Sequence, residues 1–211
     1  DQSQVWVGVV SKGPQGTVLN SSYKTRNDTK YIQDLGNAIV NYTRMIPDGL
    51  LVFFPSYSVM RQSIEAWKSH GQGGSSIWER ISQYKAPVVE PSDASSFPTA
   101  ALEFKKQLDS PAQSGAVFFG VCRGKASEGL DFSDRAGRAV VITGIPFAMM
   151  TDPKVRLKKE VMDTNVRNAR MRQPLDNNKN DHAEPLSGDM WYVQQAMRAV
   201  NQAIGRVIRH K

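Results

Sequence analysis

The side chains best suited to chemistry lie in the C-terminal stretch 190–211, which contains no proline and a single glycine. At about 100° per residue, this stretch predicts a helix with two faces. The apolar face comprises Val193, Met197, Val200, Ile204, Val207 and Ile208. The polar stripe has no acid and comprises Gln195, Arg198, Gln202, Arg206 and Arg209. Because the planar fork of arginine pairs with phosphate oxygens, we interpret the stripe as an anion-binding face; a solvated basic face is the alternative.

A second group of candidates follows an apolar run at residues 50–54. The turn Pro55-Ser56-Tyr57-Ser58 presents hydroxyl groups, backbone amides and an aromatic ring at the start of a predicted helix. Such a turn suits a phosphate oxygen. A plain helix cap with Tyr57 packed on it is the alternative interpretation.

The segment 122–132 follows another apolar run and contains both basic residues and glycines. It is not a Walker A loop, because no glycine stands five residues before Gly124 and no Ser or Thr follows Lys125. Arg123 and Lys125 could meet phosphates, and Gly124 and Gly129 allow close backbone approach. Asp131 could accept hydrogen bonds from ribose hydroxyls. Glu128 and Asp131 could also form a metal site or an acid–base pair, but the absence of an accompanying histidine or further carboxylate disfavours this. Cys122 is predicted to be a packed residue and not a nucleophile.

Predicted strands and helices alternate along the chain, which favours an α/β fold in one domain with a parallel sheet and helices on both faces. The predicted strands are residues 5–10, 50–54, 87–90, 116–121 and 139–143. The predicted helices run from a cap at Asp28 or Thr29 to Met45, from the 55–58 turn to Trp67, and over 77–84, 100–108 and 154–171. The polar residues 172–188 predict a flexible loop.

The composition narrows the class of protein. Among 211 residues, 27 Lys and Arg face 20 Asp and Glu, and this excess favours a polyanionic partner. The single cysteine excludes an internal disulfide or a multi-thiolate metal site made by this chain alone, and the three histidines lack metal-ligand spacing. No apolar run reaches the roughly 18–20 residues that cross a bilayer. We expect a reducing compartment, cytoplasmic or nuclear, and a chain that is part of a longer protein.

Three stretches together resemble the motifs of superfamily 2 helicases. Residues 202–209 are similar to motif VI in the Q-x-x-G-R-x-I-R form of the XPD-like iron–sulfur DNA helicases. Residues 124–132 resemble motif V, and residues 51–57 resemble motif IV. The order and spacing are those of the family, and the resemblance covers nearly all of the chain. Two longer strings, residues 121–125 and 198–210, are most similar to a telomere-maintenance branch of the family, with the Fanconi anaemia group J branch next.

The resemblance implies that residues 1–211 are the second RecA-like motor domain of a nuclear, monomeric, ATP-dependent 5′→3′ DNA helicase. Its partners would be single-stranded and forked DNA and the first RecA-like domain of the same polypeptide, without a membrane. That first domain would hold the Walker A loop and the Mg²⁺ site, and the 4Fe-4S cluster would also lie outside this chain. We therefore expect the chain alone to hydrolyse no ATP.

The resemblance also implies a role for each candidate. Arg206 and Arg209 would be arginine fingers for the γ-phosphate, and Gln202 would orient the phosphate or the attacking water. Gly129 and Asp131 would approach the nucleotide. The residues implied to grip the DNA backbone are Ser56, Tyr57, Arg123, Lys125 and Ser127.

Two other functions are compatible with these residues. One is a non-enzymatic RecA-like module that only binds nucleic acid, although such a module would have no use for arginine fingers. The other is the equivalent domain of a related helicase that serves mainly in transcription and repair.

Overall fold

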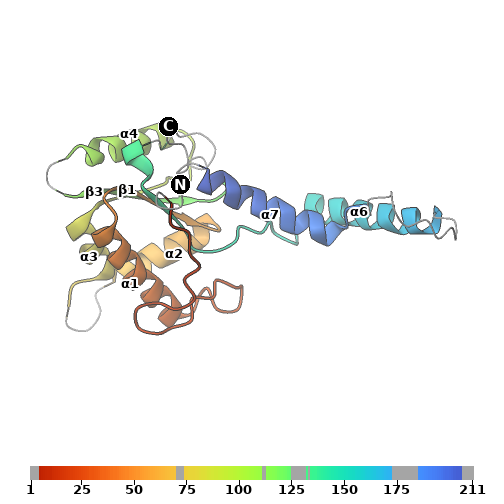
Figure 1. The fold of residues 1–211 in the computed structure, drawn as a ribbon, viewed down its shortest axis with the longest axis horizontal. Coiled ribbons are helices and arrows are strands. Elements are labelled where there is room, and N and C mark those ends of the chain that lie inside the picture. Colours follow the sequence, from red (N-terminus) through yellow and green to blue (C-terminus); the bar gives the residue numbers. More distant parts are fainter. Residues whose placement is uncertain are drawn as a thin grey trace.

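The computed structural model describes residues 5–69, 74–110, 113–124, 132, 134–172 and 185–205. Its centre is a four-stranded parallel sheet in the order β2-β3-β1-β4 (Figure 1). The strands are β1 (Asp48–Phe54), β2 (Ala86–Val89), β3 (Gly115–Val121) and β4 (Ala139–Ile142). The two central strands, β1 and β3, are almost entirely buried, as continuous apolar runs predict for a parallel sheet. The structure confirms the predicted α/β fold.

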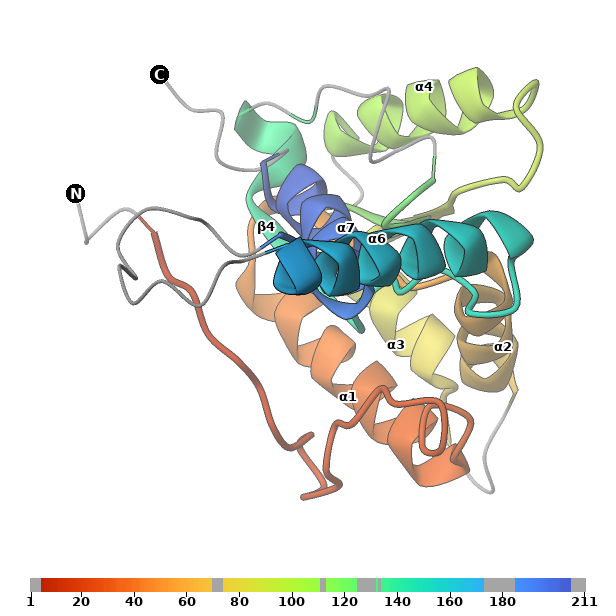
Figure 2. The ribbon, with the colours of Figure 1, turned by 90° about the vertical axis from the view of Figure 1, so that its right-hand side faces the viewer.

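Helices cover both faces of the sheet (Figure 2). On one face lie α1 (Thr29–Met45), α2 (Tyr57–Lys68) and α3 (Ile77–Tyr84), and α4 (Phe97–Leu108) lies on the other. Successive side chains of a strand point to opposite faces. Accordingly, Leu50, Val52 and Phe54 join the core under the three helices, whereas Leu51 and Phe53 join the core under α4. A short 3-10 helix, η1 (Asp134–Gly137), precedes β4.

Helix α1 begins at its predicted cap, and α3 begins at a capping box that was not predicted. The side chain of Asp28 accepts a hydrogen bond from the backbone amide of Lys30 at 2.8 Å, which satisfies one of the free amides of the first turn. Ser76 and Glu79 form a reciprocal capping box at the start of α3. The bounds of both helices agree with the predicted ones.

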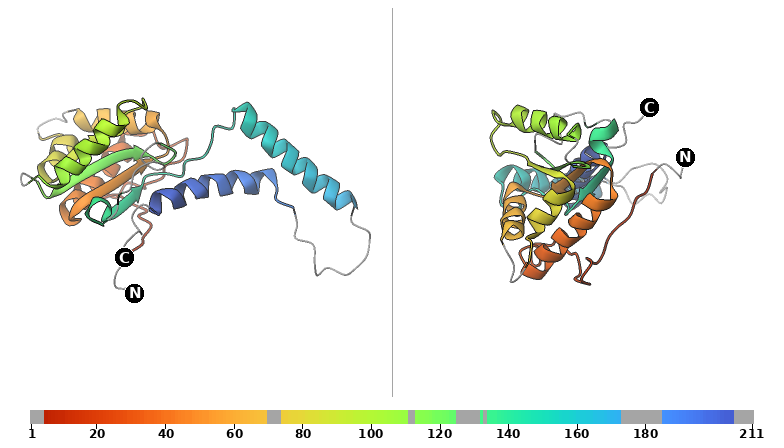
Figure 3. Two further views of the ribbon diagram at one scale, coloured as in Figure 1. Left: turned by 90° about the horizontal axis from the view of Figure 1, so that it is seen from above. Right: turned by 90° about the vertical axis from the view of Figure 1, so that its left-hand side faces the viewer.

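Two further helices, α6 (Pro153–Arg172) and α7 (Gly188–Ile204), project from the α/β body and are called here the helical arm (Figures 1 and 3). The ammonium of Lys159 contacts the carboxylate of Asp189 at 2.6 Å, and Asp163 accepts a hydrogen bond from the amide of Gly188 at 2.8 Å. The last turn of α7 returns to the body, where Ala203 is buried in the core cluster on the α4 side of the sheet. Within the ranges that the structure describes, no helix is both long and apolar enough to cross a membrane.

The predicted strand at residues 5–10 is wrong. These residues form no strand, and the only pairing near them is an isolated antiparallel bridge between Lys12 and Val18. Trp6 and Val9 are 81% and 98% exposed. Alternating apolar residues favour a strand, but a strand also needs a neighbour to pair with, and no described strand lies beside this segment.

The apolar face predicted for α7 is not the side that the structure buries most. Val193 and Met197, which belong to that predicted face, are 47% and 38% exposed. The residues buried instead are the small ones, Ala196, Ala199 and Ala203. Because the alanine side chain is small, the alanine side of α7 can approach its neighbours closely. This side is therefore buried, and the side with the larger apolar residues is more exposed. The predicted loop 172–188 is bracketed by α6 and α7, and residues 173–184 lie outside the described part of the chain.

Candidate functional site

The candidate residues from two separate loops meet at the carboxyl ends of the parallel strands. Phe54, the last residue of β1, lies opposite Val121, the last residue of β3. The segments that follow, residues 55–57 and 122–124, therefore leave the sheet side by side. The amide of Cys122 donates to the carbonyl of Phe54 at 3.0 Å, which extends the contact past the strand ends. Ligands of open α/β sheets bind at this edge.

Glu90, the residue after β2, connects these two loops. Its side chain is buried, and its Oε1 accepts a hydrogen bond from the hydroxyl of Tyr57 at 2.8 Å. Its Oε2 accepts a hydrogen bond from the amide of Val121, also at 2.8 Å. A Cβ atom at Gly124 would come within 2.4 Å of the same carboxylate, so this position requires glycine. Glu90 therefore fixes the Tyr57 loop and the start of the 122–132 segment relative to each other.

Sequence reasoning missed Glu90, which it treated as the end of a strand. Its two partners are 33 and 31 residues away in the sequence, so no local pattern reveals them. The available signal was a carboxylate that directly follows a buried strand, since a buried charge requires partners.

The Ser56–Tyr57 turn forms the helix cap that is one of the two interpretations considered for it, and its contact with a phosphate stays a prediction. Ser56 is the N-cap of α2, and its hydroxyl accepts a long hydrogen bond of 3.4 Å from the amide of Val59. The hydroxyl of Tyr57 donates a hydrogen bond to Glu90, and its half-buried ring packs against the core beneath α1, α2 and α3. The position of Tyr57 is therefore set from inside the protein.

The neighbouring residues Cys122 and Arg123 have opposite environments. Cys122 is fully buried, and burial raises the pKa of its thiol to about 12, so it is a packed residue and not a nucleophile, as predicted. Arg123 is exposed and forms no hydrogen bond or ion pair with another described residue. Its guanidinium is therefore available to an anion at the carboxyl ends of the strands.

Gln202 is the described member of the predicted nucleotide site. It is exposed on the last turn of α7, one residue before the buried Ala203. Ala203 belongs to the same buried cluster as Cys122, which brings the end of α7 to the body. The predicted residues Lys125, Ser127, Gly129, Asp131, Arg206 and Arg209 lie outside the described residues.

Comparison with known proteins decides the family. Residues 39–211 match the family model described as the helicase C-terminal domain. The chain belongs to the helicase C-terminal domain family.

Several curated proteins are similar to this helicase domain over its whole length. It is 54% identical over 212 residues to the regulator of telomere elongation helicase 1 homolog of Oryza sativa, and 55% identical over 210 residues to that of Arabidopsis thaliana. Each match covers 99% of the chain and 20% of the relative. The rat regulator of telomere elongation helicase 1 is 44% identical over 100% of the chain and 15% of its own length. The chain thus spans a fifth or less of these relatives.

A solved XPD helicase structure has the same fold. It matches with a TM-score of 0.50 and 19% identity, covering 89% of this chain and 27% of that one. This likeness confirms the predicted RecA-like α/β fold class.

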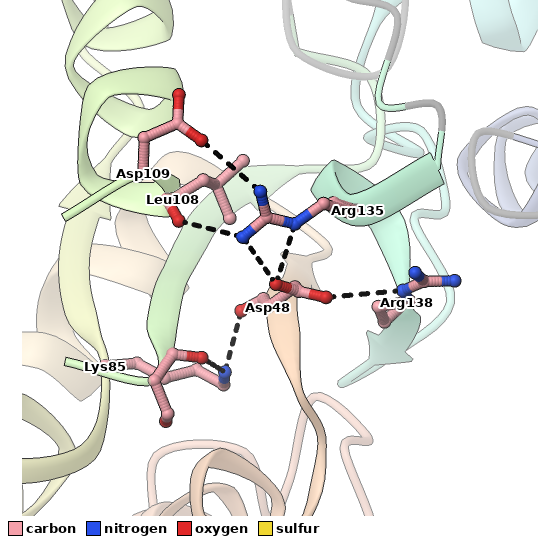
Figure 4. Close-up of polar contacts among 7 residues, drawn as sticks. Asp48, Lys85, Leu108, Asp109, Arg135 and Arg138 are labelled. Atoms are coloured by element: carbon pink, nitrogen blue, oxygen red, sulfur yellow. Dashed lines mark hydrogen bonds and ion pairs between the residues drawn. The ribbon is translucent and has the colours of Figure 1, made fainter. Parts of the chain in front are cut away.

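The opposite edge of the helicase domain carries a different charged cluster, at the amino ends of the strands (Figure 4). The carboxylate of Asp48 contacts the guanidinium groups of Arg135 at 3.0 Å and Arg138 at 3.5 Å. Arg135 also contacts Asp109 at 3.4 Å. Burial alone would raise the pKa of Asp48, but the hydrogen bonds and charges of the two arginines together lower it.

Lys85 completes this cluster from inside the protein. Its ammonium donates to the backbone carbonyls of Asp48 at 2.7 Å and Ser114 at 3.0 Å, and its side chain is fully buried. Burial lowers the pKa of Lys85 to about 8, opposed by the charge of Asp48. The charged groups of this edge contact one another and the starts of β1 and β3, so we interpret them as structural.

The described residues offer no metal centre. No group of three or more His, Cys, Asp or Glu that could hold a metal occurs within the described ranges. A four-thiolate iron–sulfur cluster does not fit this helicase domain, because its single cysteine is buried in the core.

Proposed function

We propose that this helicase domain is the second motor domain of an ATP-dependent 5′→3′ DNA helicase that acts in the nucleus, in telomere maintenance, DNA repair and recombination control. The observation that carries the proposal is the meeting of Ser56, Tyr57 and Arg123 at the carboxyl ends of the strands. The family match and the names of the relatives support the helicase part. The telomere part comes from those names and from the motif strings.

DNA binding at this edge would use three kinds of group. The exposed guanidinium of Arg123 would pair with a phosphate, and the Ser56 turn would offer a hydroxyl and backbone amides. The ring of Tyr57 would stack on a base or a sugar. Lys125 and Ser127, from the same segment as Arg123, would extend these backbone contacts along a single strand.

ATP hydrolysis would require the first RecA-like domain of the same polypeptide. That domain would bind most of the ATP and supply Mg²⁺, which neutralises charge on the phosphates. From this chain, Gly129 and Asp131 would approach the nucleotide, and Gln202 would orient the attacking water. Arg206 and Arg209 would stabilise the charge that develops on the γ-phosphate, so the chain alone should hydrolyse no ATP.

The sharpest test is Arg209→Ala in the full-length protein. An arginine finger contacts the phosphate mainly in the transition state, so its loss lowers turnover more than binding. We expect kcat of the DNA-stimulated ATPase to fall by about 10³–10⁵-fold, roughly 4–7 kcal/mol, with DNA affinity nearly unchanged. Arg209→Lys should restore little, because an ammonium cannot reproduce the planar fork.

Arg198→Ala is the matched control. Arg198 is exposed on the same predicted stripe, about three turns earlier, and should affect kcat much less. Retention of wild-type kcat by Arg209→Ala would exclude the finger. It would favour the alternative, a RecA-like module that only binds nucleic acid.

A further inference from the structure

The positive charge of this protein is concentrated on the helical arm. The whole chain carries 27 Lys and Arg and 20 Asp and Glu, a net charge of +7. Helix α6 alone has seven basic and two acidic residues in its 20 positions, a net charge of +5. The remainder of the chain is therefore close to neutral. The basic excess that favours a polyanionic partner belongs to the arm and not to the loops at the strand ends.

One face of α6 is occupied by packing against α7. Val155 and Val166 are buried, and Lys159 contacts Asp189 and lies 5.2 Å from the ring centre of Tyr192. Asp163, one of the two acids of α6, accepts the amide hydrogen bond of Gly188. The contact between α6 and α7 thus accounts for Lys159 and Asp163.

A second face of α6 points away from that contact and is called here the arm strip. At helical spacing it comprises Lys154, Leu157, Lys158, Val161, Asn165 and Asn168, all of them exposed. It contains no acid, and Leu157 is 64% exposed. Lys154 and Lys158 are four residues apart, where like charges destabilise a helix by about 0.2–0.5 kcal/mol. Neither forms an ion pair with a described residue, so the strip carries a repulsion that nothing in the described fold relieves.

The chemistry of the arm strip suits a nucleic-acid backbone. Ammonium groups pair with phosphates, carboxamides bond to phosphate and sugar oxygens, and short apolar side chains contact sugars. The arm is also connected directly to the proposed DNA edge, because β4 ends there at Ile142 and residues 143–152 lead from it to Pro153. Figure 3 shows this connecting segment between the body and α6. DNA that leaves the strand ends along this segment would reach the arm.

We propose that the helical arm is an auxiliary DNA-binding surface, with the arm strip contacting phosphates beyond the site at the strand ends. The inference rests on the proposed DNA-binding function and assigns most of the electrostatic part of binding to α6. Single strands and duplexes share the phosphate chemistry, and the two probes below distinguish them.

The test compares two charge-matched double variants of the chain. Lys154→Gln with Lys158→Gln neutralises the arm strip, and Lys105→Gln with Lys106→Gln removes the same charge from exposed positions on α4. Fluorescence anisotropy measures the affinity for a labelled oligothymidylate and for a labelled duplex over a series of salt concentrations. Circular dichroism checks that both variants keep their helix content.

We expect the arm variant to lose about tenfold or more in affinity at low salt for at least one probe. Its log–log salt slope should fall by about 1.4 on the single strand or 1.8 on the duplex, which corresponds to two lost phosphate contacts. The α4 variant should change affinity less than about twofold, because it alters only the net charge.

Three results would overturn the proposal. Equal losses in both variants would show that net charge alone sets the affinity. If the arm variant binds DNA as the wild type does but no longer binds labelled polyglutamate, the partner of the arm strip is an acidic protein and not DNA. A wild-type chain that binds neither DNA probe would remove the proposed DNA-binding function as well, whereas the first two results leave that function standing.

Discussion

At the amino ends of the strands, Asp48, Arg135 and Arg138 contact one another, and Lys85 donates to two backbone carbonyls. At the carboxyl ends, Arg123 is exposed and forms no hydrogen bond or ion pair with another described residue. Both edges carry basic residues at the ends of the same parallel strands. Those of the amino edge already have partners within the chain, whereas Arg123 of the carboxyl edge is available to an external anion.

This difference separates structural charge from functional charge. A paired ion is explained by the fold, since a buried charge without a partner is costly. An exposed arginine contributes little to folding and is available to bind. Glu90 is an exception to this difference between the two edges. It lies at the carboxyl edge, yet it is buried and accepts hydrogen bonds from Tyr57 and Val121. The carboxyl edge thus combines a fixed inner carboxylate with a free outer cation.

The largest effect that would sharpen this contrast is expected at Glu90. Glu90→Ala leaves the hydroxyl of Tyr57 and the amide of Val121 without their acceptor, so the free energy of unfolding should fall by about 2–4 kcal/mol. Glu103→Ala, on the exposed side of α4, should cost less than about 0.5 kcal/mol. Urea unfolding measures both. Similar losses from the two variants would mean that Glu90 does not support the site.

A smaller effect concerns Lys85 and the amino edge. Its pKa is about 8 in the folded protein, against 10.5 for an unperturbed lysine. Between these values the unfolded state binds more protons, so the free energy of unfolding rises with pH and the gain is lost as pH falls through 8. This rise should be about 1–3 kcal/mol.

Lys85→Met is the matched variant for this titration. It has no ionisable group, so the part of the rise that comes from Lys85 should vanish. Unfolding titrations at a series of pH values compare the two proteins, and the difference between them isolates Lys85 from the tyrosines. Identical pH profiles would show that Lys85 is not the buried ammonium of the amino edge.

The elements that local rules determine could be predicted from the sequence. Helix α1 is determined by residues close together in the sequence, namely the cap at Asp28 and the helical spacing of Ile32, Leu35 and Ile39. Its bounds are therefore the predicted ones. The apolar runs of β1 and β3 predict buried parallel strands for the same reason. Ser56 and Tyr57 could be identified because they follow such a run.

The features that long-range contacts determine could not be predicted. Residues 5–10 have a strand pattern but no neighbouring strand. Helix α7 has both an alanine side and a side of larger apolar residues, and only packing with the rest of the chain buries the alanine side. The partners of Lys85 are 37 and 29 residues away in the sequence, as remote as those of Glu90.

We propose that the carboxyl edge binds DNA, whereas the amino edge supports the fold. Arg123→Gln and Arg135→Gln remove the same charge from the two edges, and both variants can be tested for oligothymidylate affinity and for urea unfolding. Arg123→Gln should weaken binding about 3–10-fold and lower the salt slope by about 0.7, with unfolding unchanged within about 0.5 kcal/mol. Arg135→Gln should keep the affinity and lose about 0.5–1 kcal/mol of stability. Equal weakening of DNA binding by both variants, or unchanged binding in Arg123→Gln, would contradict the account.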